Sequence, residues 1–85
     1  MKWDAMTEPE IYASLTEILQ EVFMRDDISV SPSLSAKDVE GWDSIKQIEI
    51  IIAAEQRFSI KFTTRELDRL ENVGDLVSII QAKAP

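Results

Sequence analysis

Three stretches of the chain place apolar residues at helical spacing. The first begins with the capping-box sequence Thr7-Glu8-Pro9-Glu10, which carries proline in the first turn. The apolar residues that follow recur every three or four positions and make one stripe. Its members are Ile11, Leu15, Ile18, Leu19 and Val22. The pattern predicts a helix that ends near Phe23 or Met24.

The second stretch, Ser44 to Phe58, contains β-branched residues that are also typical of a strand. Its length, the N-capping residue Asp43 and the lack of a turn signal before Ser59 favour a helix. Isoleucines cover more of the circumference than one core-facing stripe needs, so we expect one set inside and another toward an edge or a partner. The core set is Ile48, Ile51, Ile52 and Phe58, and the edge set is Ile45 and Ile50.

The C-terminal third of the chain predicts one short and one longer helix. Thr63-Thr64-Arg65-Glu66 caps a short helix that bears Leu67 and Leu70. Asn72-Val73-Gly74-Asp75 then opens a last helix, whose apolar residues follow the i, i+3, i+4, i+7 rule. These residues are Val73, Leu76, Val77 and Ile80.

A long connection, residues 25–42, separates the first two helices. It carries scattered apolar residues, so we expect it to pack across the core, with a short helical turn around residues 36–39. The chain is therefore expected to be all-α, an antiparallel bundle of three main helices plus one short helix, with a long loop between the first and second helices. Residues 1–85 form a single domain in this interpretation.

Composition removes several classes of function. The 85 residues include no Cys and no His, which excludes thiol nucleophiles, Ser-His-Asp triads and the usual zinc sites, so we do not expect an enzyme. A net charge of -7 disfavours nucleic acid and favours partners with basic surfaces. The longest apolar run, Ile50 to Ala54, is too short to span a membrane, and no signal peptide is visible. We expect a cytoplasmic monomer.

The sequence Gly41-Trp42-Asp43-Ser44-Ile45 holds the most reactive candidate. With Asp43 as N-cap, Ser44 is the first helical residue, and its hydroxyl lies beside the unpaired N–H groups of the first turn. A helix N-terminus favours an anion such as a phosphodiester on that hydroxyl. Gly41 gives the turn backbone freedom, and Trp42 is expected to brace the loop by packing. The alternative from these residues alone is that Ser44 is an ordinary surface serine.

The helix pattern, the acidic balance, the long first loop and Asp43-Ser44-Ile45 together resemble the acyl carrier protein family over essentially the whole chain. In that family an Asp-Ser-Leu type tripeptide carries the serine to which 4′-phosphopantetheine is attached, and Ile45 stands here where leucine is usual. The resemblance implies that Ser44 is the attachment residue, with Asp43 and Ile45 completing the motif.

The resemblance also implies the chemistry around Ser44. Inside a separate phosphopantetheinyl transferase, which supplies magnesium, the Ser44 hydroxyl attacks the pyrophosphate of coenzyme A. The thiol of the attached arm then holds an acyl group as a thioester, so Ser44 is a handle and not a catalyst. The tethered acyl group visits acyl ligases, acyltransferases or synthases of fatty acid, lipid or polyketide-type biosynthesis. The branched interior is a possible shelter for an aliphatic acyl chain.

Partner docking is expected on the second helix. The resemblance suggests an acidic face that meets Arg and Lys on partner enzymes, together with apolar residues beside the serine. The expected set is Ile45, Ile48, Glu49, Ile52 and Glu55. Ordinary solvated helix positions are the alternative for Glu49 and Glu55.

This second helix is less acidic than that of fatty acid synthesis carriers, because Lys46, Gln47, Gln56 and Arg57 dilute its charge. We therefore expect a specialised discrete carrier that addresses a dedicated enzyme. Two other functions stay open. A peptidyl or aminoacyl carrier shares the fold but more often has Gly-Gly-His-Ser before the helix, and an unmodified helical interaction module predicts that Ser44→Ala is tolerated.

Overall fold

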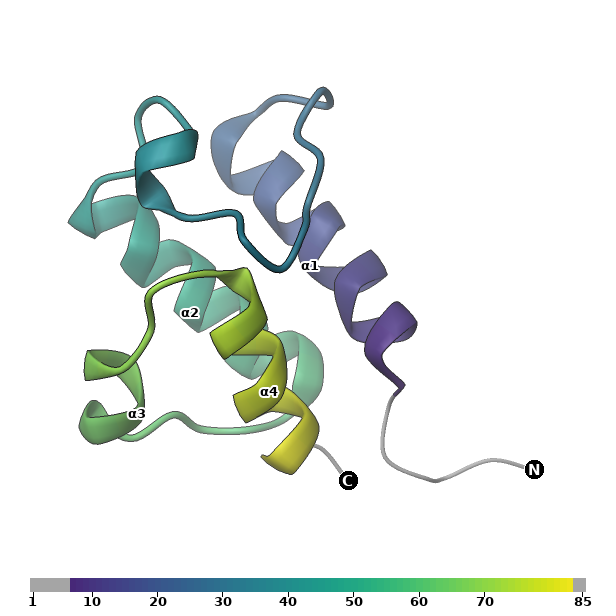
Figure 1. Ribbon diagram of the computed structural model, residues 1–85, viewed down its shortest axis with the longest axis vertical. Coiled ribbons are helices and arrows are strands. Elements are labelled where there is room, and N and C mark those ends of the chain that lie inside the picture. The colour runs from purple at the N-terminus through teal and green to yellow at the C-terminus, as the bar shows by residue number, and fades with distance from the viewer. Residues whose placement is uncertain (1–6, 84–85) are drawn as a thin grey trace.

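The chain folds into helices joined by one long and two short connections (Figure 1). The computed structural model describes residues 7–83, and no strand occurs in that range. The main helices are α1, Glu8–Phe23, α2, Ser44–Phe58, and α4, Val73–Lys83, and the short helix is α3, Thr64–Asp68. α2 runs back roughly opposite to α1. The predicted all-α bundle with three main helices and one short helix is confirmed.

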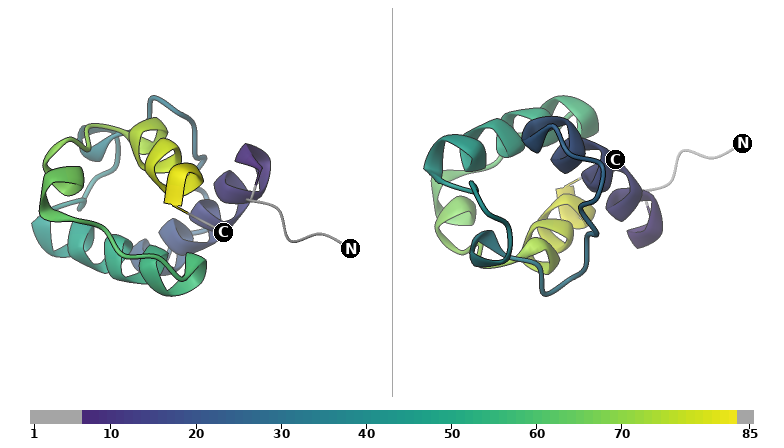
Figure 2. Two further views of the ribbon diagram at one scale, coloured as in Figure 1. Left: turned by 90° about the horizontal axis from the view of Figure 1, so that it is seen from below. Right: turned by 90° about the horizontal axis from the view of Figure 1, so that it is seen from above.

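Four helices surround a common core. Figure 2 shows α3 between α2 and α4, on the side of the molecule away from α1. The α1 stripe supplies four residues that are at most 2% exposed, Ile11, Leu15, Ile18 and Leu19. The predicted α4 residues Val73, Leu76, Val77 and Ile80 are buried as well. None of the helices within residues 7–83 is both long enough and apolar enough to cross a membrane.

The predicted division of the α2 isoleucines is partly wrong. Ile51 and Phe58 are buried as expected, but Ile48 and Ile52, expected in the core, are 57% and 48% exposed. Ile50, expected at the edge, is 1% exposed, whereas Ile45 is 65% exposed. The reason is helical geometry: Ile50, Ala54 and Phe58 repeat at four-residue spacing along the face that meets the core, and Ile45, Ile48 and Ile52 share the opposite face.

The predicted helix starts are confirmed by their caps. Thr7 and Glu10 form the capping box of α1, and the Thr63 hydroxyl accepts a hydrogen bond from the Glu66 N–H in the capping box of α3. α1 and α2 both end in left-handed residues that are not glycine, Met24 with φ 54° and Ser59 with φ 57°. Their backbone N–H groups donate to carbonyls of the preceding turn, which closes each helix end.

The connection between α1 and α2 crosses the core, as predicted, and contains a 3₁₀ turn at Ala36–Asp38. Ile28 and Val39 are both 8% exposed. Midway, the connection reaches the start of α4 (Figure 1), where Val73 N donates to Leu34 O at 2.8 Å and Gly74 N donates to Pro32 O at 2.9 Å. Carbonyls of the loop therefore satisfy free donors at the N-terminus of α4.

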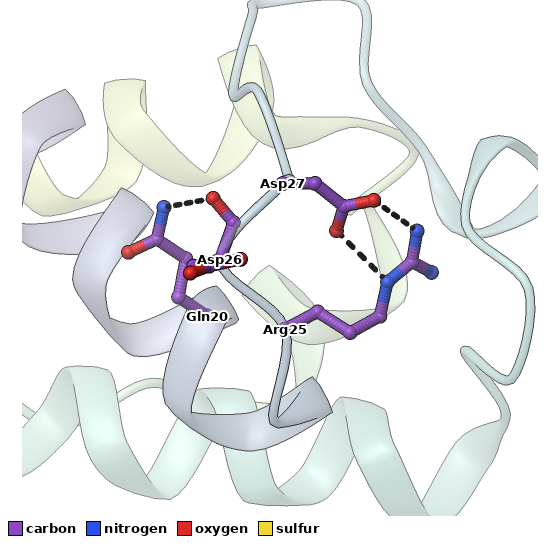
Figure 3. A network of polar contacts seen from close by, with 4 residues as sticks. All are labelled: Gln20, Arg25, Asp26 and Asp27. Carbon is purple, nitrogen blue, oxygen red and sulfur yellow. Dashed lines mark hydrogen bonds and ion pairs between the residues drawn. The ribbon is translucent and has the colours of Figure 1, made fainter.

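A small polar network lies at the C-terminal end of α1 (Figure 3). The Arg25 guanidinium donates to both carboxylate oxygens of Asp27, each at 3.0 Å, and Gln20 Nε2 donates to Asp26 O at 3.5 Å. The hydrogen bond from Arg25 lowers the pKa of Asp27 below its ordinary value. Both charged side chains are well exposed, so this pair orders the turn more than it stabilises the fold.

Candidate functional site

Ser44 lies exposed at the first position of α2. Asp43 Oδ1 accepts a hydrogen bond from Lys46 N at 2.9 Å, so Asp43 is the N-cap, as predicted. Within residues 7–83, the Ser44 hydroxyl and the backbone N–H groups of Ser44 and Ile45 have no hydrogen-bond partner. An unpaired hydroxyl beside two free donors fits a phosphodiester on Ser44, since the helix N-terminus supports its negative charge.

The turn before Ser44 is braced from two sides. Gly41 has φ +89°, a left-handed conformation that favours glycine. The ring of Trp42 packs 5.7 Å from that of Phe23 at the end of α1, and its Nε1 donates to Gln47 Oε1 at 2.8 Å. Trp42 is partly buried against the core, which confirms the predicted packing role. These contacts tie the serine-bearing turn to α1 and α2.

An apolar face of α2 begins next to Ser44. It consists of Ile45, Ile48 and Ile52, three of the four large hydrophobic residues that are exposed within residues 7–83. Glu49 lies among them, with 49% of its side chain exposed and a contact of 3.6 Å to Lys46 Nζ. The structure thus brings four of the five predicted docking residues together on one exposed face.

The fifth predicted docking residue, Glu55, has a different environment. It is half-buried, and its Oε2 accepts a hydrogen bond from Phe62 N at 2.9 Å, which holds the segment that leads into α3. Sequence reasoning missed this contact, because nothing near Glu55 in the sequence marks Phe62 as its partner.

The two cations expected to change the charge of the docking face contact α1. Lys46 Nζ donates to Val22 O at 3.3 Å, and Arg57 Nη1 pairs with Glu17 Oε1 at 2.9 Å. They link the first and last turns of α2 to α1. Their positive charges therefore lie along the border with α1, beside the apolar face and not within it.

A cavity of about 310 Å³ opens on the other side of α2. It lies between the 3₁₀ turn, α2, α3 and the start of α4. Its volume is at the lower end of the range for small-molecule sites. The lining residues are Ser35, Ala36, Trp42, Gln47, Ile50, Leu67, Leu70, Glu71, Asn72, Val73 and Leu76. Ile50 is the isoleucine in this lining, and Leu67 of α3, Leu70 of the following link and Leu76 of α4 supply much of the remaining apolar surface.

α3 closes this cavity without a residue of its own that is fully buried. Besides the Glu55 contact, it is held by Lys83 Nζ, 3.3 Å from Glu66 Oε1. The pKa of Glu66 is lowered, first by the hydrogen bond from the Thr63 N–H and then by Lys83. These polar contacts with α2 and α4 act together with Leu67, which is partly buried against the core, to hold α3.

Comparison with known proteins finds a family model and relatives that match most of the chain. The sequence model of the family described as "Phosphopantetheine attachment site" matches residues 13–80. The chain is 36% identical to the meromycolate extension acyl carrier protein of Mycolicibacterium smegmatis over 77 residues, which cover 91% of this chain and 78% of that protein. It is 34% identical to the acyl carrier protein of Acidothermus cellulolyticus over 76 residues, which cover 89% of this chain and 90% of that one.

A solved structure has the same fold. The solution NMR structure of a holo acyl carrier protein from Geobacter metallireducens superposes with a TM-score of 0.81 at 38% identity. The match covers 85% of this chain and 83% of that protein. The two proteins are therefore similar in both fold and sequence.

Proposed function

The chain belongs to the acyl carrier protein family, and from this membership we propose that Ser44 carries its covalent 4′-phosphopantetheine. Members of this family carry an acyl group as a thioester on the thiol of that arm. They are carriers and not catalysts. The observation that carries the proposal is the exposed Ser44 hydroxyl, unpaired within residues 7–83, at the N-terminus of α2. Asp43 caps the helix, and Ile45 completes the motif beside it.

The residues around Ser44 support attachment by a separate enzyme. The serine oxygen forms a bond to the phosphorus of coenzyme A that bears the pantetheine, and the adenosine bisphosphate half leaves with the bridging oxygen. Among the described residues, no group of three or more His, Cys, Asp or Glu side chains is arranged to hold a metal ion. The N–H groups of Ser44 and Ile45 then face the new phosphodiester charge.

Intact mass spectrometry tests the attachment residue. Incubation with coenzyme A, magnesium and a broad-specificity phosphopantetheinyl transferase should add one phosphopantetheine to the protein. Ser44→Ala should abolish the gain, while Ser78→Ala, which changes an exposed serine of α4, should not. A gain that survives in Ser44→Ala would refute the assignment.

The exposed face of α2 is the proposed docking surface for enzymes with basic patches, the transferase first. Ile45, Ile48 and Ile52 supply apolar contact beside the attachment residue, and Glu49 supplies negative charge. Glu55 stays in the proposed set, although its hydrogen bond to Phe62 gives it a structural role as well.

Ile48→Glu tests this surface. We expect the transferase's kcat/KM for the variant to fall about tenfold, the effect of losing roughly 1.4 kcal/mol at an interface anchor. Met24→Glu is the matched control, because Met24 is 90% exposed but lies outside α2. Equal losses for both variants would mean that added charge, and not this face, causes the effect.

The cavity is the proposed shelter for the acyl group. It needs no opening of the packed core, since about 310 Å³ is already present between α2, α3 and α4. Two relatives named above are acyl carriers, one of them named for meromycolate extension, which supports lipid biosynthesis as the pathway class. Lys46 and Arg57 reduce the net negative charge of α2, and this supports a dedicated partner enzyme in that class of pathway.

A further inference from the structure

Two residues with side-chain amides line the cavity. Gln47 of α2 and Asn72 at the start of α4 both line it, together with the apolar residues Leu67, Leu70 and Leu76. A saturated acyl chain makes no hydrogen bond to an amide NH₂ group, whereas an acyl chain that carries an oxygen can accept one. The orientation of the two amides therefore bears on what the cavity binds.

The hydrogen bonds at these amides determine which way each one faces. Gln47 accepts from Trp42 Nε1 at 2.8 Å, and Asn72 accepts from Asp75 N at 2.9 Å. An indole nitrogen and a backbone nitrogen can only donate, so the atom that faces each of them must be the amide oxygen. This reasoning holds even though oxygen and nitrogen of an amide are otherwise hard to tell apart.

Both NH₂ groups are consequently left over. Within residues 7–83, neither Gln47 Nε2 nor Asn72 Nδ2 has a hydrogen-bond partner. No buried polar side-chain atom in that range lacks a partner, so the two nitrogens are accessible. Each offers two N–H donors from a residue that lines the cavity, and Leu67, Leu70 and Leu76 supply apolar contacts in the same lining.

We propose that Gln47 and Asn72 select an acyl group that carries a keto or hydroxyl oxygen. This inference rests on the proposed function, because it assumes an acyl chain tethered to Ser44. The ligand chemistry is an acceptor oxygen held by amide NH₂ groups, with the hydrocarbon part of the chain against Leu67, Leu70 and Leu76. The pantetheine arm also contains carbonyl oxygens, and the acyl group is the source to which the proposal commits.

The test loads Ser44 with acyl groups of one length through the transferase. The probes are hexanoyl, 3-oxohexanoyl and 5-oxohexanoyl coenzyme A, with unacylated coenzyme A as the fourth arm. Mass spectrometry first confirms loading, thermal melting then compares the loaded forms, and ¹⁵N NMR follows the side-chain NH₂ signals of Gln47 and Asn72. A protein without mass gain refutes the attachment itself, before any question of selectivity.

We expect at least one oxo-loaded form to melt about 4 to 8 °C above the hexanoyl form, as one net hydrogen bond in a domain of this size would give. Its NH₂ signals should shift, and those of the unacylated form should not. Gln47→Glu and Asn72→Asp keep the accepting oxygens but remove the donors, so each should abolish the difference. Gln56→Glu makes the same change at an exposed site of α2 outside the cavity and should preserve it.

Two results would overturn the proposal. A hexanoyl form at least as stable as both oxo forms would mean that the amides select nothing. NH₂ shifts already complete in the unacylated form would assign these donors to the arm and not to the acyl group.

Discussion

The two sides of α2 are built differently. Toward α1, fully buried side chains fill the interface, Lys46 contacts Val22 near the C-terminal end of α1, and Arg57 contacts Glu17 in its middle. Toward α3, a cavity of about 310 Å³ remains, and a five-residue helix is held by Glu55 and Lys83. This difference matches the proposed roles of the two sides: the packed α1 side holds the helix that bears Ser44, and the cavity on the α3 side is the proposed place for the tethered acyl chain.

We expect the largest difference in unfolding free energy when one leucine is truncated on the α1 side of α2 and another on its α3 side. Leu15→Ala removes a side chain that is 1% exposed in the α1 interface and should cost about 2–5 kcal/mol of unfolding free energy. Leu67→Ala, beside existing empty space, should cost about 1 kcal/mol. Urea denaturation of both variants measures the contrast. Equal losses would mean that the α3 side is packed as tightly as the α1 side.

A smaller effect is expected where the long loop meets α4. A Cβ on Gly74 would lie 3.1 Å from the Pro32 carbonyl oxygen, which accepts the Gly74 N–H. Gly74→Ala should therefore lose about 1 kcal/mol of stability, although the same change inside an unhindered helix stabilises by about 0.5–1 kcal/mol. Thermal melting decides the sign, with Ser78→Ala in the same helix as a control for propensity. A stabilised Gly74→Ala variant would show that the loop around Pro32 moves aside at little cost in free energy.

The smallest expected effect is a pH dependence of stability that is confined to α3. The pKa of Glu66 lies below its ordinary value of 4.5, because the Thr63 N–H and Lys83 favour the carboxylate in the folded protein. Its contribution to stability is thus complete above that ordinary value and is lost as pH falls toward the lowered pKa. The protection of the α3 amides against exchange, measured relative to their intrinsic exchange rates, should therefore fall over this window in the wild type. Glu66→Gln should remove this pH-dependent loss of protection, and an unchanged pH dependence in the variant would exclude Glu66 as its source.

Local signals in the sequence predicted the elements well. Thr7, Asp43 and Thr63 cap the helices that they were expected to cap, and Ser44 occupies the first position of α2. These features depend on neighbours within one turn, where residue type and spacing carry the information. Local signals fail at Met24 and Ser59. Both end a helix in the left-handed conformation, although neither is the glycine that usually marks such a position.

What could not be predicted depends on partners distant in the sequence. Ile48 and Ile50 are chemically identical, and only the placement of α1 and α3 around α2 decides which is buried. The cavity has no sequence signal, because its walls come from four separate segments. The hydrogen bond from the Trp42 indole to the Gln47 oxygen joins residues only five positions apart, but it depends on the conformation of the turn between them, which residue types do not specify.

The hydrogen bonds from Val73 and Gly74 to the loop carbonyls have a consequence for folding kinetics. The first turn of α4 is completed by Leu34 and Pro32, far earlier in the chain, so this helix cannot finish forming from its own residues. Such non-local closure couples the appearance of α4 to the docking of the loop. We therefore expect the domain to fold in one cooperative step, with no populated intermediate in which α4 is formed while the loop is still free.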